Sequence, residues 1–424
     1  MMERAIVEAV AQLRASGEPY VTATVVRVRG SAYRRPGARM VIARDRWVAG
    51  SVSGGCLEGD LARTAWWRAD AAAGAPVVVA YDARLPSDGD GVDIADDDGL
   101  REELRAAFGV GCDGVVEVMI EPAPPPGALD PIAFAGDCAR AERRGAIATV
   151  FASADARVAA GARLARVAGE PVFGDALPDD VAWAITRALD AAIARGTSAT
   201  VDTGDLQVLV EALVPPPWLF VFGTGHDAVP LVAQARALGW RVATCTPQQR
   251  VFARARFLDV DELVTGSPAD AAARLDRCDR AYAVVMNHDY ALDRTCLGAL
   301  LGSRARYIGM LGPRGRTARL LNELGRDGAG DARIHAPVGL DLEAETPAEV
   351  ALAIAAEVQA AVASVDTAAS LSDRIGPIHG RDAAAPQPPP DIQPRSKIDA
   401  AIAAIQAVVD DDTADFQLQL DEVA

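Results

Sequence analysis

Apolar and polar positions along this chain repeat with two different periods, and their order predicts its elements. From Arg4 to Ser16, apolar residues recur at helical spacing, which predicts an amino-terminal helix that ends at Gly17. Short apolar runs such as 115–120 and 207–210 are instead typical of buried strands. Strands and helices interleave in this way over most of the chain, which predicts an α/β protein.

A strand, a glycine turn and a helix follow one another in the second half of the chain. Residues 218–222 are all apolar, and Gly223-Thr224-Gly225-His226-Asp227-Ala228 follows them directly. This G-x-G-x-x-A pattern between a strand and a helix is typical of dinucleotide-binding turns. The next strand, 241–245, completes a β-α-β unit, so we predict a Rossmann-like, doubly wound parallel sheet here. The candidate cofactor-binding residues of the turn are Gly223, Gly225 and His226.

Changes in composition divide the chain into three parts. Pro215-Pro216-Pro217 cannot continue a helix or supply strand donors, so we place a domain boundary there. The apolar periodicity stops near Val365, and the remainder is rich in proline and acidic residues, as is typical of a mobile tail. We therefore predict a first domain over 1–214, a Rossmann-like domain over 215–365 and a tail over 366–424.

The first domain contains a degenerate repeat with an offset near 125 residues. Residues 23–25 (Ala-Thr-Val) recur at 148–150, and residues 37–40 (Gly-Ala-Arg-Met) recur as Gly-Ala-Arg-Leu at 161–164. The matches are collinear, so we expect a mixed α/β domain of two related halves, each roughly strand, strand, helix, strand. Two glycine-rich segments occur only in the first half, which favours a functional role for both.

The first of these segments, Gly50–Gly55, holds three glycines and two serines and directly precedes a predicted helix that starts at Cys56. Backbone N–H groups of such a loop can point at one oxyanion, and the helix adds positive potential. We therefore expect a phosphate to bind there. The candidate cofactor-binding residues are Ser51, Ser53, Gly54 and Gly55. Glu58, in the first turn of the same helix, is a candidate catalytic residue.

Two cysteines lie in or beside these segments. A thiol in the first turn of a helix has a lowered pKa, which predicts that Cys56 is a catalytic nucleophile or a metal ligand. Cys112 lies in the second segment, Gly109–Gly114, and could face Cys56 across a cleft as a second catalytic candidate. The alternative for both is a small buried apolar side chain, in the case of Cys112 within a tight turn before a strand.

Upstream of the glycine loop, residues 29–39 place four arginines around a turn between two predicted strands. Guanidinium groups pair well with phosphate and carboxylate. We therefore predict that Arg34, Arg35 and Arg39 bind the phosphate of a ligand held by the loop. The alternative is a flexible hairpin with solvated arginines, but the short separation from the glycine loop favours one common site.

The Rossmann-like domain departs from a standard NAD site. Such a site has an acidic residue about 20 residues after the glycine turn, where it binds the ribose hydroxyls. This chain has Thr246 there, and Arg250 nearby could accept a 2′-phosphate, so NAD(P) is a conditional cofactor with a preference for the phosphorylated form. His288 and Asp289 follow strand 283–286 and are further candidate ligand contacts, although a helix cap explains them equally well.

Charge and composition exclude several classes of function. The 424 residues include 42 Lys and Arg against 59 Asp and Glu, a net charge of −17, which argues against nucleic acid or an anionic membrane as a partner. No apolar run reaches the ~18 residues of a membrane helix, and the amino end lacks a signal-peptide pattern, so we expect a cytoplasmic protein. Six cysteines lie far apart without a C-x-x-C pair, which argues against a zinc ribbon or a disulfide scaffold.

Taken together, these motifs resemble those of the XdhC/CoxI family of accessory proteins for molybdenum hydroxylases such as xanthine dehydrogenase and carbon monoxide dehydrogenase. The resemblance spans Met1 to Val362. In the first domain it rests on residues 30–31, 35–40, 50–58 and 109–114. In the second domain it rests on residues 223–226, 287–289, 307–312, 334–341 and 346–350.

The resemblance implies a protein that binds molybdenum cofactor (molybdopterin), shelters it, supports its sulfuration and delivers it to the apo molybdenum hydroxylase. It implies no turnover of its own, and it implies a cysteine desulfurase as a second partner. We expect a homodimer, the commonest closed assembly. The chain departs from the family pattern where Thr246-Pro247-Gln248 replaces an expected Asp-Pro-Arg, which weakens the case for a nucleotide. The rival hypotheses are an NAD(P)-dependent oxidoreductase that uses the second domain and a regulatory scaffold with a vestigial nucleotide fold.

Overall fold

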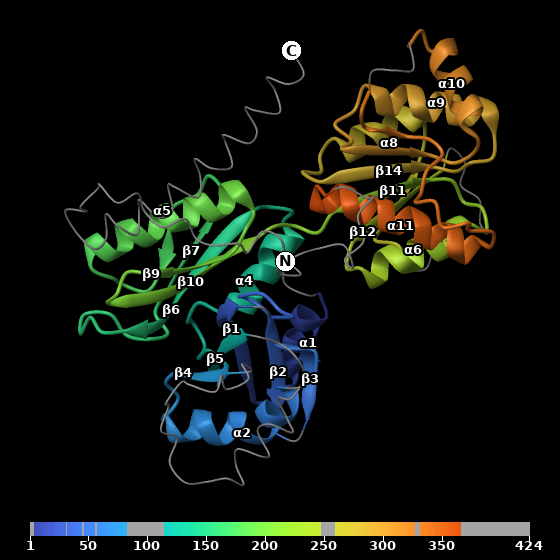
Figure 1. Cartoon of the computed structure of the whole chain (residues 1–424). Coiled ribbons are helices and arrows are strands. Elements are labelled where there is room, and N and C mark those ends of the chain that lie inside the picture. The colour runs from blue at the N-terminus through green and yellow to red at the C-terminus, as the bar shows by residue number, and fades with distance from the viewer. Residues whose placement is uncertain are drawn as a thin grey trace. The chain divides into compact units, whose positions relative to one another are not determined.

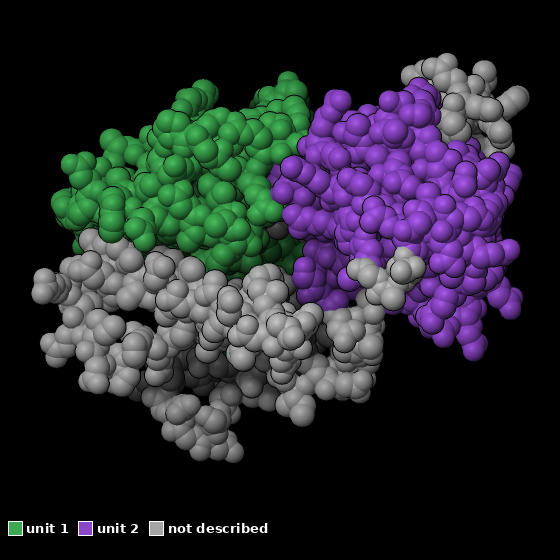
Figure 2. All heavy atoms as spheres, turned by 90° about the horizontal axis from the view of Figure 1, so that it is seen from above, with its two compact units in different colours: residues 1–214, 371–424 green, residues 215–370 purple. Residues whose placement is uncertain are grey.

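The computed structural model describes residues 4–30, 32–44, 46–55, 57–82, 114–246, 259–326 and 331–365. Contacts divide the chain into two compact units, and the division falls between Val214 and Pro215 (Figure 2). Cys56, Cys112, Arg250 and the predicted tail lie outside the described residues. In the described part, no helix is long and apolar enough to cross a membrane.

The first unit consists of two five-stranded antiparallel sheets, each accompanied by two helices (Figure 1). The first sheet, in the order β3-β2-β1-β5-β4, consists of β1 (Tyr20–Gly30), β2 (Arg39–Ala43), β3 (Trp47–Gly50), β4 (Val77–Asp82) and β5 (Gly114–Pro122). The second sheet, in the order β8-β7-β6-β10-β9, consists of β6 (Gly145–Ser153), β7 (Arg163–Val167), β8 (Phe173–Gly174), β9 (Ala199–Asp202) and β10 (Leu206–Leu213). The helices are α1 (Arg4–Ser16) and α2 (Glu58–Ala71) in the first half, and α4 (Pro131–Arg140) and α5 (Asp179–Arg195) in the second.

The shared strand order confirms the predicted duplication and extends it. Each half runs helix, three strands, helix, two strands, whereas the sequence pattern predicted strand, strand, helix, strand. A two-residue strand such as β8 is too short to show a period in the sequence. The register shows the repeat residue by residue, because Thr24 lies opposite Arg39 in the first sheet and Thr149 lies opposite Arg163 in the second.

The two faces of each sheet have different neighbours, because side chains alternate along a strand. One face of the first sheet packs on α2, and one face of the second sheet packs on α5. The opposite faces meet in a small apolar cluster of Val26, Met119, Phe151 and Leu209. Val26 and Phe151 occupy equivalent positions of the repeat, as do Met119 and Leu209, so the contact between the halves is pseudo-symmetric.

The second unit is a six-stranded parallel sheet with helices on both faces (Figure 1). Its order, β13-β12-β11-β14-β15-β16, is the 3-2-1-4-5-6 order of a Rossmann fold and confirms that prediction. The strands are β11 (Trp218–Phe222), β12 (Arg241–Thr246), β13 (Glu262–Thr265), β14 (Ala281–Val285), β15 (Tyr307–Met310) and β16 (Ile334–His335). The helices of its described part are α6 (Ala228–Ala237), α8 (Pro268–Leu275), α9 (Tyr290–Leu301), α10 (Arg314–Glu323) and α11 (Pro347–Ala363).

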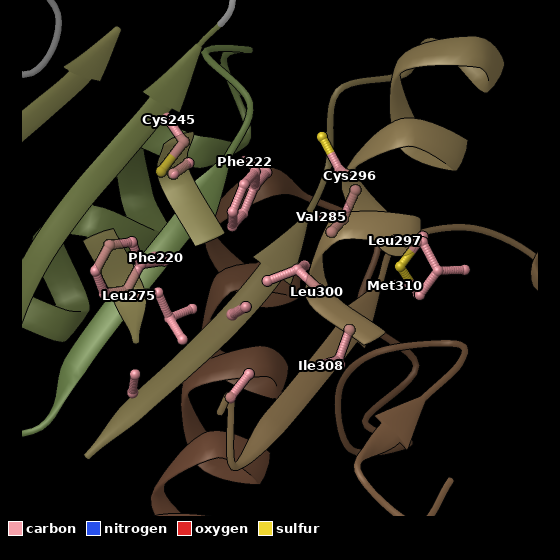
Figure 3. Close-up of a cluster of buried hydrophobic side chains, with 14 of the residues drawn as sticks. Phe220, Phe222, Cys245, Leu275, Val285, Cys296, Leu297, Leu300, Ile308 and Met310 are labelled. Atoms are coloured by element: carbon pink, nitrogen blue, oxygen red, sulfur yellow. The ribbon is translucent and has the colours of Figure 1, made fainter. Parts of the chain in front are cut away.

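Each face of the parallel sheet has its own core. Helices α8, α9 and α10 cover one face, where they pack on Phe220, Phe222 and Val285 of the strands (Figure 3). Helices α6 and α11 cover the other face, around Tyr282 and Tyr307. The chain leaves β11 toward one side of the sheet and β14 toward the other, so the carboxyl ends of these strands form the switch point at which open α/β sheets bind ligands.

Candidate functional site

The arginine-rich turn and the glycine loop of the first unit lie in contact. Arg34 donates to the hydroxyl of Ser51 from Nε at 3.1 Å and from Nη2 at 2.5 Å. The ring of Tyr33 lies beside Gly54, where an added Cβ would be 3.7 Å from Cδ1 of the ring. Tyr33 is 62% exposed, and Gly54 and Gly55 are exposed as well. We call this open area the turn-loop surface, defined by Tyr33, Arg34, Arg35, Ser51, Gly54 and Gly55.

The start of the glycine loop is fixed by a close approach of two strands. Gly50, at the end of β3, has a φ of +74°, and a Cβ there would collide with the carbonyl oxygen of Arg39. Gly174 stands in the same relation to Arg163 in the second half, so this approach belongs to the shared scaffold. The following helix starts eight residues after Gly50 but five residues after Gly174, so the first half has three extra residues in its loop.

The carboxylate of Glu58 fills the inside of this loop. It accepts hydrogen bonds from the backbone N–H groups of Val52 at 3.0 Å, Ser53 at 2.8 Å and Gly55 at 3.0 Å. The hydroxyl of Ser53 also donates to it, at 2.5 Å, and Glu58 is only 2% exposed. We predicted that these amides bind a phosphate from outside, with Ser53 among its contacts. The structure instead gives the amides of Val52, Ser53 and Gly55 a side chain of the protein as their partner, and phosphate binding at this loop stays a prediction.

Glu58 therefore organises the loop, and its burial does not suit the catalytic role predicted for it. Burial alone raises the pKa of Glu58, but hydrogen bonds from Ser53 and Val52 outweigh this effect and hold the pKa below its ordinary value. Helix α2 begins at Glu58, whereas the sequence pattern predicted that this helix starts at Cys56. The thiolate roles of Cys56 and Cys112 fall outside the described residues and stay predictions.

Arg39 is separated from the turn-loop surface. Its guanidinium makes two hydrogen bonds to Glu211, at 2.7 and 2.6 Å, and the two side chains are 2% and 5% exposed. The predicted contact of Arg39 with a ligand phosphate does not fit this geometry, because its donors are used inside the protein. Arg163 pairs with Glu121 at the equivalent positions, so each half supplies an arginine to a glutamate of the other.

The glycine turn of the second unit lies at the switch point between β11 and β14. Gly223 has a φ of +145°, and a Cβ there would be 2.6 Å from the carbonyl oxygen of Met286, so the turn requires glycine at this position. Gly225 and the exposed His226 follow, and α6 begins after Asp227. The turn thus has a strand before it and a helix after it, as the sequence pattern predicted.

His288 and Asp289 differ in what they contact. Asp289 accepts a hydrogen bond from the backbone N–H of Leu292 at 3.0 Å and caps α9, which is the alternative role considered for it. His288 instead reaches the glycine turn, where its Nε2 lies 2.6 Å from Oδ2 of Asp227. Sequence analysis gave Asp227 no role of its own.

Asp293 is a second polar residue that sequence analysis missed. It is 1% exposed, accepts from the side chain of Asn287 at 2.9 Å and pairs with Arg316 at 2.6 Å. Asn287 follows β14 and Arg316 lies in the first turn of α10, so this buried carboxylate of α9 connects the loop after β14 with α10. An acidic residue on the apolar side of α9, one turn before Cys296, was the signal that could have identified it. Within the described ranges, no group of three or more His, Cys, Asp or Glu residues could hold a metal ion.

Comparison with known proteins matches both units to the same kind of protein. The family described as "XdhC and CoxI family" matches residues 13–82, and the family described as "XdhC Rossmann domain" matches residues 219–358. With the fold, these matches define a protein that joins a duplicated α/β domain to a Rossmann domain. The chain belongs to the XdhC and CoxI family.

Two relatives match most of the chain, and a third matches a shorter part. A protein of Bacillus subtilis (strain 168), described as a probable subunit of xanthine dehydrogenase, is 28% identical over 348 residues, which are 80% of this chain and 92% of that protein. A crystal structure described as a xanthine dehydrogenase from Bacillus halodurans matches with a TM-score of 0.66 and 26% identity, over 86% of this chain and 98% of that chain. A shorter match, to "Uncharacterized protein YqeB" of Escherichia coli (strain K12), is 28% identical over 160 residues, 37% of this chain and 29% of that protein.

Proposed function

We propose that this chain is an accessory protein of a molybdenum hydroxylase of the xanthine dehydrogenase type. In this role it binds molybdenum cofactor on the turn-loop surface, supports its sulfuration and delivers it to the apo-hydroxylase. Family membership and the names of the relatives support the association with xanthine dehydrogenase. The observation that carries the proposed cofactor site is the contact between Arg34 and the glycine loop, because it brings a guanidinium to a loop that lies beside the exposed ring of Tyr33.

The residues of the turn-loop surface fit the parts of molybdopterin. The guanidinium of Arg34, with the exposed Arg35 next to it, suits the phosphate. The exposed ring of Tyr33 offers a flat apolar face for the pterin. Cys56 follows Gly55 directly and would meet the metal or a transferred sulfur, both of which suit a thiolate. When bound, the cofactor supplies the redox centre of the client hydroxylase.

In this proposal, each residue of the site has its own role. Ser51 accepts a hydrogen bond from the guanidinium of Arg34 and positions it. Glu58 fixes the conformation of the glycine loop by accepting hydrogen bonds from its backbone amides. In this proposal the arginines hold the phosphate, because the amides of Val52, Ser53 and Gly55 are bonded to Glu58. A cysteine desulfurase that supplies the sulfur and a homodimeric assembly are further parts of the proposal.

We expect the chain purified from a cofactor-producing host to contain pterin, measured by fluorescence after oxidation. Arg34→Ala is expected to contain about tenfold less or lower still, because a hydrogen bond to a charged group contributes about 1.5–3 kcal/mol. Arg140→Ala is the matched control, since it removes an exposed arginine of α4. Wild-type protein without pterin, but with turnover of a nicotinamide cofactor, would support the alternative of an NAD(P)-dependent oxidoreductase, which the Rossmann strand order favours.

Cys56→Ser is expected to melt almost like the wild type and to lose cofactor retention or hydroxylase activation, and Cys112→Ser is expected to show a partial version. Cys138→Ser is the control, because this buried thiol lies away from the loop; a poorly paired hydroxyl there costs about 1–2 kcal/mol, but the folded protein keeps its cofactor. A Cys56→Ser protein that retains pterin and activates its client normally would show that the thiolate role is wrong. In that case Arg34 and Arg35 hold the ligand by its phosphate alone.

A further inference from the structure

The dinucleotide-type turn of the second unit contains a carboxylate of its own. A Cβ built on Gly225 would be 2.5 Å from Oδ1 of Asp227. In Rossmann domains, the second glycine of the turn keeps this space open so that the backbone can approach the pyrophosphate of the ligand. In this chain, an oxygen of Asp227 fills the space that the missing side chain leaves.

His288 holds Asp227 in this place. Its Nε2 lies 2.6 Å from Oδ2, the other carboxylate oxygen, and its Cδ2 is 3.7 Å from the same Cβ position on Gly225. His288 has a φ of +58°, a conformation that is uncommon for a residue with a side chain. Its two neighbours fix it there, because Asn287 is bonded to a buried carboxylate of α9 and Asp289 caps that helix.

The charge of Asp227 has a direct consequence for anionic ligands. The residue lies at the amino end of α6, where the helix dipole favours a negative charge. A pyrophosphate would bind at the same positive end of α6. The ligand and the carboxylate of Asp227 would therefore occupy the same position and repel each other. Binding of the ribose is also unfavourable, because β12 ends at Thr246, where NAD sites have an acidic residue that binds the ribose hydroxyls.

We propose that Asp227, positioned by His288, is a specificity-determining residue that excludes dinucleotides and other diphosphates from the second unit. The ligands that this unit admits have no phosphate at the glycine turn. This inference concerns the second unit alone and does not rest on cofactor binding by the first.

The test is a calorimetric titration of the full chain with NADH, NADPH and ADP-ribose. We expect weak binding by the wild type, and binding that is tighter by about tenfold or more in Asp227→Ala and Asp227→Asn, because a like charge at the phosphate position is removed. Adenosine, which has no phosphate, is expected to bind both variants and the wild type alike. Asp341→Asn removes an exposed acidic residue of the same unit and is the matched control, with unchanged affinities.

Comparison of Asp227→Ala with Asp227→Asn distinguishes the effect of the negative charge from the effect of the side-chain volume. Asp227→Asn keeps the volume of the side chain and its contact with His288, and circular dichroism checks that each variant is folded. A gain of affinity in both variants supports exclusion by charge, and a gain in Asp227→Ala alone supports exclusion by occupied space. Micromolar binding of NADH by the wild type would overturn the proposal, as would folded variants that both bind no better than the wild type.

Discussion

Replacing Glu211 by glutamine is expected to lower the free energy of unfolding of the first unit by about 3–5 kcal/mol, because it leaves the buried charge of Arg39 without a counter-ion. The two side chains share two hydrogen bonds and are almost completely buried. Glu121→Gln, at the equivalent place opposite Arg163, is expected to act in the same way. Urea denaturation followed by hydrogen exchange of the β2 and β10 amides measures this unit without interference from the second.

The control for this prediction is an exposed pair in the same unit. Glu170 pairs with Arg143, but these side chains are 48% and 43% exposed, so Glu170→Gln is expected to cost at most about 1 kcal/mol. Arg39→Met combined with Glu211→Leu removes both buried charges, and we expect it to be more stable than either single variant. A loss for Glu211→Gln no larger than the loss for Glu170→Gln would contradict the stabilising role of the pair.

The reciprocal pairs explain how two diverged halves still form one unit. Each half provides an arginine from its second strand and a glutamate from its last strand, and each arginine binds the glutamate of the other half. The apolar cluster between the sheets has the same reciprocity. In a symmetric dimer the same rule holds, since residue i contacts j and residue j contacts i. The glycine loop is built on this scaffold but lies outside the reciprocity, because its three extra residues have no counterpart.

The duplication was visible in the sequence because equivalent strand residues keep their type at a constant offset, as residues 23–25 and 148–150 do. The Rossmann unit was visible because its glycine turn has a fixed spacing between a strand and a helix. The pairing of Arg39 with Glu211 could not be predicted in the same way. A repeat shows which residues are equivalent, but it does not show which faces of the two sheets meet.

The candidate site was predictable to a similar degree. The contact between Arg34 and the glycine loop followed from their positions on either side of the β2-β3 hairpin. The partner of the loop amides did not follow, although a signal was present. Glu58 is an acidic residue in the first turn of a helix that comes after Ser53, and such residues often bond backward to the preceding backbone. The sequence did not distinguish Arg39 from the other three arginines of residues 29–39. Its different role follows from its position in β2, where its side chain is buried.

Replacing Glu58 by alanine is expected to cost about 2–4 kcal/mol and to release the glycine loop, because three backbone N–H groups and a hydroxyl lose their common acceptor. The pKa of Glu58 is lowered in the folded protein, so its contribution to stability is present above the pKa of the unfolded chain. That contribution is lost as the pH falls through the lowered pKa. Protection of the loop amides against hydrogen exchange is therefore expected to persist in mildly acidic solution. It is expected to disappear when the pH falls below the lowered pKa of Glu58.

The same variant links the loop to cofactor binding. Pterin content is expected to fall in Glu58→Ala, as is expected for Arg34→Ala. Glu58 does not contact the ligand in this proposal, but without it Gly54 and Gly55 lose their fixed place on the turn-loop surface. Glu8→Gln, which changes an exposed glutamate of α1, is expected to leave both protection and pterin content unchanged. A loss of pterin in Glu58→Ala with wild-type protection of the Val52 and Ser53 amides would show that Glu58 acts on the ligand directly, and not by holding the loop.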